Sequence, residues 1–133
     1  MRLIFFFIPI LYLYSCSKPS AITRQLSGSD SIAINFNHTD GTIQKTVSAT
    51  EPNAIKKLLQ FVDSKPTTPY NCGYDGNILF FKNGKISGDI SFNFTGVGCR
   101  HFIIELNGQL MATTLNNEAV DFLQSLREGK DWY

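Results

Sequence analysis

The sequence predicts an α+β fold, in which about six antiparallel strands form a twisted sheet and two amphipathic helices pack on one of its faces. Three Asp-Gly or Asn-Gly pairs, at 40–41, 83–84 and 107–108, separate runs rich in β-branched and aromatic residues, which is the pattern of tight β-hairpins. Two further segments carry apolar residues at the three- to four-residue spacing of a helix face. Together these observations predict the element order ββαββββα.

The first hairpin and the first helix are expected within residues 31–63. Apolar residues alternate with polar or small ones in the first strand, at Ile32, Ile34 and Phe36. Residues 43–49 are a second β-rich run and are predicted to form the returning strand. Thr50 then offers a capping hydroxyl, and Pro52 is acceptable in a first helical turn, so a helix is predicted from Glu51 to about Asp63. Its apolar face comprises Ile55, Leu58, Leu59 and Val62.

Residues 64–77 are predicted to form the longest loop, because they contain two prolines, two glycines and two tyrosines. The second hairpin follows, with strands at residues 78–82 and 85–94. Gly88 in the second of these strands indicates a bulge or a close backbone approach. Strict alternation places four apolar side chains on one face of the same strand: Ile86, Ile90, Phe92 and Phe94.

The third hairpin is expected at residues 99–106 and 109–114, and the last helix at residues 117–128. Asn116 is a typical N-cap for this helix, and Gly129 is a typical residue after its end. The inner face of the helix comprises Ala119, Phe122, Leu123 and Leu126.

The N-terminus has the pattern of an export signal. Arg2 precedes an apolar run over residues 3–14, which as a helix would span roughly 18 Å, whereas the bilayer hydrocarbon is roughly 30 Å thick. Pro9 also interrupts the run. Residues 1–15 are therefore predicted to be a cleaved signal peptide and not a membrane span. The ending Leu13-Tyr14-Ser15-Cys16 resembles the lipobox of bacterial lipoproteins, in the form found in Bacteroidota.

This resemblance implies that Cys16 is lipidated on sulfur and becomes the acylated, palmitate-bearing first residue of the mature chain. An ordinary cleaved signal with a chance cysteine is the alternative. Ser17 and Lys18 match neither the inner-membrane retention signal nor the acidic run of surface-exported lipoproteins, so the resemblance implies the periplasmic face of the outer membrane. Residues 16–29 are small and polar and are predicted to form a flexible tether, followed by a single domain over residues 30–133.

Cysteine usage agrees with export. With Cys16 assigned to lipid, Cys72 and Cys99 remain, and an even count in an exported chain predicts a disulfide. If Lys82 pairs with Lys85 across the hairpin turn, Cys72 falls close to the start of the third hairpin. Neither cysteine has a close Cys or His partner at zinc-ligand spacing, so no metal site is predicted. The bridge should stabilise the fold by about 3 kcal/mol.

Charge and motifs exclude two classes of partner. The sequence has 12 Lys and Arg residues against 11 Asp and Glu residues, and removal of Arg2 with the leader makes the mature side chains formally neutral. No basic run supplies a local field, so nucleic-acid binding is not expected. Gly96-Val97-Gly98 is not followed by the Lys-Ser or Lys-Thr of a phosphate loop, and no cofactor is predicted.

Residues suited to catalysis are few. His38 lies in a polar turn and is predicted to be a surface residue. His101 shares a strand face with Glu105, and a small periplasmic hydrolase would depend on this pair. No Gly-x-Ser-x-Gly motif or nearby His-Asp set completes a triad. Asp75 and Asp89 each lie beside a glycine, as turn and bulge residues do, and are weak metal-ligand candidates. The sequence therefore predicts a protein that is not an enzyme.

Aromatic residues support a recognition hypothesis. Tyr70 and Tyr74 lie in the predicted long loop, and Trp132 and Tyr133 end the sequence; such side chains are favoured at protein and sugar contacts. Alternatively, the tyrosines cover the disulfide and the tail folds onto the domain. The first functional hypothesis is a tethered binding or inhibitory module for an envelope protein or polysaccharide. An accessory subunit of an outer-membrane assembly is second and the hydrolase third, and no motif identifies a domain family.

Overall fold

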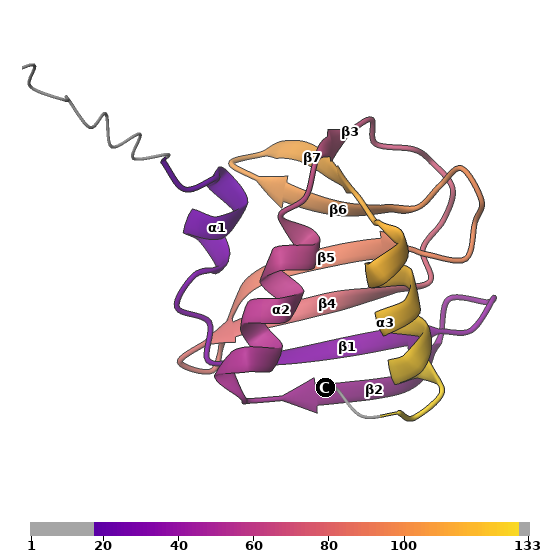
Figure 1. Cartoon of the computed structure of the whole chain (residues 1–133), viewed down its shortest axis with the longest axis horizontal. Helices are drawn as coiled ribbons and strands as arrows, with labels where there is room; N and C mark the ends of the chain where they lie inside the picture. The colour runs from indigo at the N-terminus through magenta and orange to yellow at the C-terminus, as the bar shows by residue number, and fades with distance from the viewer. Residues whose placement is uncertain (1–17, 131–133) are drawn as a thin grey trace, which may run out of the picture.

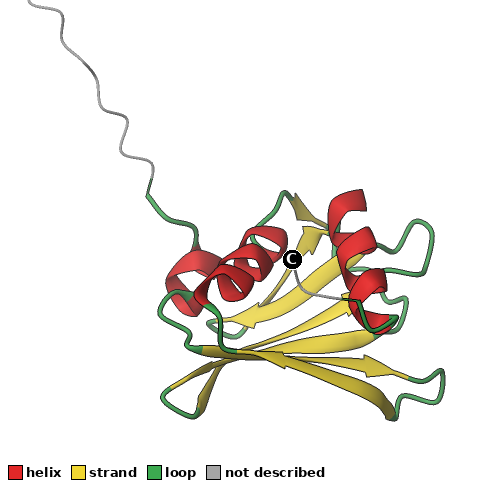
Figure 2. Cartoon of the chain, turned by 60° about the horizontal axis from the view of Figure 1, so that its bottom comes forward, coloured by secondary structure: helices red, strands yellow, loops and turns green. Residues whose placement is uncertain are grey.

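The computed structural model describes residues 18–130, which form one seven-stranded antiparallel sheet and three helices. In chain order the elements are α1 (Ala21–Leu26), β1 (Ser31–Asn37), β2 (Ile43–Ala49), α2 (Pro52–Val62), β3 (Pro66–Thr67), β4 (Gly76–Lys82), β5 (Lys85–Asn93), β6 (His101–Leu106), β7 (Gln109–Thr114) and α3 (Asn117–Arg127). The strands lie in the order β2-β1-β4-β5-β6-β7-β3 (Figure 1). All three helices lie on the same side of the sheet (Figure 2). The predicted α+β class with an antiparallel sheet is confirmed.

Tight turns close the hairpins where the sequence predicts them. Lys82 pairs with Lys85 across the β4–β5 turn, and Leu106 pairs with Gln109 across the β6–β7 turn. The asparagine that opens each turn, at positions 83 and 107, has a positive φ of 52° and 51°, and the following glycine is also left-handed. Consecutive left-handed residues give a two-residue turn whose twist matches that of the flanking strands, which explains why Asn-Gly is the pair found there.

The core lies between the helices and the sheet and is rich in phenylalanine. The rings of Phe36, Phe92 and Phe94 contact one another at centroid distances of 5.9, 6.3 and 5.8 Å. Phe61 of α2 and Phe122 of α3 approach to 5.2 Å and join the two helices above the sheet. The predicted apolar faces of both helices pack into this core, where only Leu59 is partly exposed. Helical periodicity therefore identified the buried faces correctly.

The two long helices begin in different ways. Asn116 caps α3 as predicted, since its side chain accepts a hydrogen bond from the Ala119 amide at 2.8 Å. The predicted cap of α2 is wrong: its N-cap is Glu51, not Thr50, and no side chain caps it. Pro52 removes one of the amides that would need a cap at this end.

The predicted face of β5 is correct for three residues and wrong for Ile86. Phe80 pairs with Gly88 and Phe81 with Ile86, so Ser87 is an extra residue that shifts the register. This is the bulge that Gly88 indicated, and it turns Ile86 to the face without helices, where the side chain is 59% exposed. Strict alternation cannot anticipate one inserted residue.

The predicted flexible tether over residues 16–29 is wrong for its second half. Ser20 caps α1, a short helix whose Ile22 and Leu26 side chains are buried in the core. A Cβ atom built on Gly88 would lie only 2.3 Å from Leu26 Cδ2, so Gly88 also provides the predicted close approach, here to a helix. The Ser20 and Thr23 hydroxyls each donate to Asp63 at 2.6 Å. The folded domain therefore includes the residues from Ser20 on, ten positions before the predicted boundary at residue 30.

The predicted long loop, residues 64–77, contains a short strand and the start of another. Pro66 and Thr67 form β3, which pairs with Thr113 and Ala112 at the edge of the sheet. This strand is the seventh, beyond the six predicted. Two paired residues carry no periodicity that a sequence pattern could reveal, so β3 exists only because β7 supplies the partner.

The face of the sheet without described helices carries a row of hydrogen-bonded polar side chains. Thr46 donates to Asn35 at 2.7 Å, Asn35 donates to Asn77 at 3.0 Å, and Asn77 donates to Asp89 at 2.8 Å. Asp89, a weak metal-ligand candidate, is thus an acceptor in this row. Within residues 18–130, none of the helices has the length and apolar character required to cross a bilayer.

Candidate functional site

Three irregular loops meet at one end of the sheet, which we call the loop end. It comprises residues 38–42 between β1 and β2, residues 68–75 before β4, and residues 94–100 between β5 and β6. Because the strands are antiparallel, the end of β1 and of β5 lies beside the start of β4 and of β6, and Figure 1 shows these loops together on the right of the molecule. α1 lies at the opposite, left-hand end.

A disulfide joins two of these loops, as predicted. Cys72 bonds to Cys99, with the Cα atoms 6.1 Å apart. Before the bridge, the Tyr70 ring lies against the His101 ring at a centroid distance of 5.8 Å. After it, the Gly73 carbonyl accepts a hydrogen bond from Asn93 at 3.1 Å. The loop over residues 68–75 therefore passes over the start of β6 and the end of β5 and is attached to both strands.

Asp75 connects this loop to the one between β5 and β6. Its carboxylate accepts the amides of Phe94 at 2.7 Å and Thr95 at 2.9 Å, and also the Thr95 hydroxyl at 2.9 Å. Its own amide donates to the Phe92 carbonyl at 2.8 Å. Asp75 is therefore a structural acceptor, and no group of three or more metal-binding side chains occurs among residues 18–130.

An open cleft of about 730 Å³ lies at the loop end. Its lining comes from all three loops and from the end of α3: Asn37, His38, Thr39, Asp40, Gly41, Cys72, Gly73, Tyr74, Asp75, Asn93, Thr95, Gly96 and Arg127. The exposed hydroxyl, carboxylate and imidazole side chains in this set give the cleft a mixed polar and apolar surface, and Tyr74 supplies its phenol ring.

Charges of both signs line the cleft. The Thr42 hydroxyl lies 2.6 Å from Asp40 Oδ1 and holds the pKa of the Asp40 carboxyl below its ordinary value, with a further contribution from the Thr42 amide. Arg127 comes from the last turn of α3, where its guanidinium lies 4.9 Å from the Phe94 ring centroid and donates to Gln124 at 2.8 Å. The cleft can therefore offer an anionic acceptor and a cationic donor to one ligand.

The structure separates the two loop tyrosines that the sequence grouped together. Tyr74 lines the cleft and is 49% exposed. Tyr70 is 44% exposed, but its ring packs on His101, so it covers part of the fold. The other two aromatic candidates, Trp132 and Tyr133, lie outside the described residues, and so does the predicted lipidation site, Cys16.

His101 has no access to solvent, which removes the support for the hydrolase hypothesis. Its side chain is fully buried and neither ring nitrogen makes a hydrogen bond. Glu105 is exposed further along β6, so the two side chains are not brought together in a groove. An imidazole beneath Tyr70 cannot reach a substrate in this conformation.

Some lining residues carried no signal in the sequence. Arg127 looks like an ordinary basic residue in a last helical turn, and Asn93 like a strand end. Arg127 reaches the cleft because α3 lies across the sheet toward the loop end, and Asn93 reaches it because β5 ends there (Figure 1). His38, predicted as a surface residue, is exposed and lines the same cleft.

Comparison with known proteins adds no relatives to this description. No protein-family model matches the chain, and no match was found among curated proteins or solved structures.

Proposed function

We propose that the protein is a lipid-anchored, non-catalytic binding module of the bacterial cell envelope, which uses the cleft at its loop end to hold an envelope polysaccharide. The lipid is attached to Cys16 and keeps the domain at the periplasmic face of the outer membrane. The observation that carries the proposal is the cleft of about 730 Å³ with a mixed polar and apolar surface, whose lining includes the exposed Tyr74 together with Asp40, His38 and Arg127.

The chemistry of the cleft fits a sugar chain. A sugar ring presents an apolar C–H face, which packs on an aromatic ring, and a rim of hydroxyl groups, which donate to carboxylates and accept from guanidinium groups. Tyr74 supplies the ring, Asp40 the acceptor and Arg127 the donor. Protein contacts instead depend on large side chains that become fully desolvated, and the open lining, as the described residues form it, contains no Phe, Trp, Leu, Ile or Met.

The frame around the cleft is ordered before any ligand binds. The disulfide, the Asp75 carboxylate and the Asn93 amide attach the 68–75 loop to its neighbours. Loops that are already held in place lose less conformational entropy on binding, which favours affinity for a flexible polymer.

The polysaccharide proposal is tested with peptidoglycan sacculi, the insoluble glycan of the periplasm. A Cys16→Ser mature domain should co-sediment with purified sacculi, and Tyr74→Ala should weaken this binding by about tenfold, since removing a central aromatic contact costs more than about 1 kcal/mol. Ile86→Ala is the matched control, because Ile86 is 59% exposed at the opposite end. Absence of binding, or equal losses in both variants, would overturn the proposal.

A second candidate is an accessory subunit of an outer-membrane protein assembly. Val97 is 92% exposed in the loop over residues 94–100, and Ile43 is exposed next to the first loop, so the loop end also presents apolar side chains outside the cleft. Affinity purification in detergent would favour this candidate if partners were retained in stoichiometric amounts and lost in a Val97→Asp variant.

The lipid anchor has its own test. Cells expressing the full chain are fed an alkyne fatty acid, and the label should appear on the wild type and be absent from Cys16→Ser. The wild type should sediment with membranes and the variant should be released by lysis without detergent. An unlabelled wild type would contradict the anchor while leaving the glycan-binding test intact.

A further inference from the structure

We propose that the end of the domain opposite the cleft is a second interaction surface, which rests on the anionic phospholipid headgroups beside the lipid anchor. This inference relies on the proposed attachment at Cys16. The surface, which we call the α1 end, is formed by three segments: residues 18–30 with helix α1, residues 81–86 at the β4–β5 turn, and residues 106–110 at the β6–β7 turn.

The three segments form one continuous surface. The Asp30 amide donates to the Phe81 carbonyl at 2.8 Å, and the Asp30 carboxylate accepts the Asn83 amide at 2.8 Å, which joins the α1 segment to the β4–β5 turn. A groove lined by Arg24 of α1 and by Asn107 lies between the helix and the β6–β7 turn. The first described helix, α1, lies at this end (Figures 1 and 2).

The anchor holds this end close to the bilayer. Because α1 is folded onto the domain, the linker between Cys16 and the helix cap at Ser20 spans four residue steps, which reach at most about 14 Å when extended. Ser20 itself is attached to the end of α2 through Asp63. Ser20 is thus kept within about one to two Debye lengths of the anchored cysteine, a range over which an anionic surface still attracts positive charge.

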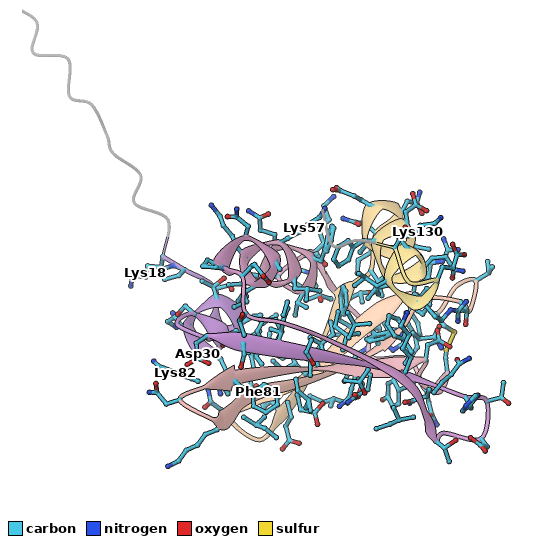
Figure 3. The ribbon with its side chains drawn as sticks, turned by 90° about the horizontal axis from the view of Figure 1, so that it is seen from below. Lys18, Asp30, Lys57, Phe81, Lys82 and Lys130 are labelled. Atoms are coloured by element: carbon cyan, nitrogen blue, oxygen red, sulfur yellow. A yellow bond between two sulfur atoms is a disulfide. The ribbon has the colours of Figure 1, made fainter. Side chains whose placement is uncertain are left out.

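The α1 end carries more basic than acidic side chains. Its four basic side chains are exposed: Lys18, Arg24, Lys82 and Lys85. Asp30 is the acidic residue within the three segments and is already bonded to the Asn83 amide. Two more acidic residues flank the segments: Glu105 on β6, and Asp63, which accepts the hydroxyls of the α1 segment. Figure 3 shows Lys18, Asp30 and Lys82 grouped at one end of the molecule and Lys130 well away from them. The excess of positive charge matches an anionic bilayer, to which each lysine adds attraction.

Apolar side chains accompany these lysines on the hairpins. Ile86, which the bulge in β5 turns outward, is 59% exposed next to Lys85, and Leu110 is 57% exposed beside the β6–β7 turn. Phe81 is half-buried next to Lys82 and pairs with Ile86. Lysines beside exposed aliphatic and aromatic groups suit the boundary between headgroups and acyl chains. Docking in this orientation turns the cleft away from the membrane and toward the periplasmic polysaccharide.

The inference is tested on a chemically anchored domain, so that lipidation in cells does not affect the result. The mature chain is coupled through Cys16, its one thiol outside the disulfide, to a maleimide lipid in vesicles of pure phosphatidylcholine or with 30% phosphatidylglycerol. Mass spectrometry then follows acylation of each lysine by a water-soluble amine reagent. On anionic vesicles, Lys82 and Lys85 should react about threefold more slowly than on neutral ones, and Lys130 should be unchanged.

Two double variants give an independent measurement. The uncoupled Cys16→Ser domain should bind anionic vesicles weakly, and Lys82→Gln with Lys85→Gln should lower that affinity by about tenfold. Lys57→Gln with Lys130→Gln removes the same charge elsewhere and should change it less than about twofold. Equal labelling of all lysines on both kinds of vesicle, or equal losses in the two variants, would overturn the proposed docking surface.

Discussion

The two ends of the sheet are built in different ways. At the α1 end, two-residue turns close the β4–β5 and β6–β7 hairpins, and the residues that make each turn are adjacent in sequence. At the loop end, a disulfide joins residues 27 positions apart, and side chains such as Asp75 bond to backbone amides 19 and 20 positions away. The hairpin turns of the α1 end therefore depend on local geometry, whereas α1 itself is attached there through distant residues such as Asp63 and Gly88. The loop end depends on long-range bonds.

This difference indicates what each end can do. Tight turns leave few backbone groups without a hydrogen-bond partner. The α1 end therefore presents side chains, chiefly lysines, from a rigid backbone. Longer loops enclose space, and the loop end thus contains the cleft. Variants that remove one type of support should leave the other end intact, and five predictions test this separation.

Removal of the disulfide should have the largest effect, and it should be confined to the loop end. In the chain-entropy description, a bridge between residues 27 positions apart stabilises the fold by about 3.5 kcal/mol. Cys72→Ser with Cys99→Ser should lower the free energy of unfolding by about that amount in urea denaturation and weaken sacculus binding. Trypsin cleavage after Arg24 of α1 should not accelerate under native conditions. If it does, the two ends are not independent.

Leu26→Ala should damage the α1 end instead. The Leu26 side chain is buried against Gly88, and loss of a buried leucine costs about 3 kcal/mol. The variant should expose α1, so trypsin should cleave after Arg24 faster than in the wild type. Sacculus binding, measured where the variant remains folded, should be unchanged. A loss of binding equal to that of the disulfide variant would contradict the comparison.

Asp75→Asn should loosen the loop end by an intermediate amount. The carboxylate accepts two amides and a hydroxyl, and hydrogen bonds to a charged acceptor are stronger than neutral ones, so a loss of about 2 kcal/mol is expected. Asp89→Asn is the control, because Asp89 is exposed and accepts one side-chain bond. Thermal denaturation of both variants measures the difference, and similar melting temperatures would exclude the assigned role of Asp75.

Substitution of the two loop tyrosines should have different effects, one on the stability of the fold and the other on sacculus binding. Tyr70→Ala uncovers the buried His101 ring and should cost about 1 kcal/mol, the scale of one aromatic contact. Tyr74→Ala should change stability by less than about 0.5 kcal/mol, as expected for an exposed side chain, while it weakens sacculus binding. Denaturant titrations and sedimentation on the same samples measure both quantities. If Tyr74→Ala lowered the free energy of unfolding more than Tyr70→Ala does, Tyr74 would be the structural residue of the two.

The smallest expected effect concerns the titration of Asp40. Since hydrogen bonds from Thr42 hold the pKa of Asp40 below its ordinary value, Thr42→Ala should raise that pKa, as measured by NMR titration of the carboxyl carbon. The sign for stability follows: the ionised form contributes above the unfolded-state pKa, and the contribution is lost as the pH falls through the folded-state pKa. An unchanged titration in Thr42→Ala would contradict the hydrogen-bond cause.

Local features of the fold could be predicted from the sequence alone. The three hairpins, the buried faces of α2 and α3 and the Asn116 cap all follow from turn chemistry and periodicity, which act between residues close in the chain. The pairing of Cys72 with Cys99 follows from export and an even cysteine count. The lipid anchor stays a prediction of the leader sequence.

The tertiary structure decided the remaining features, because each needs a distant partner. α1 has six residues, too few for a helix to be stable by itself, and it forms where Leu26 fits against Gly88. β3 requires β7, and Ile86 faces outward because of one inserted residue in β5. The cleft brings Arg127 to a turn almost 90 positions earlier in the chain. Contacts between residues so far apart in the chain depend on how the helices and strands pack, and no local sequence pattern encodes them.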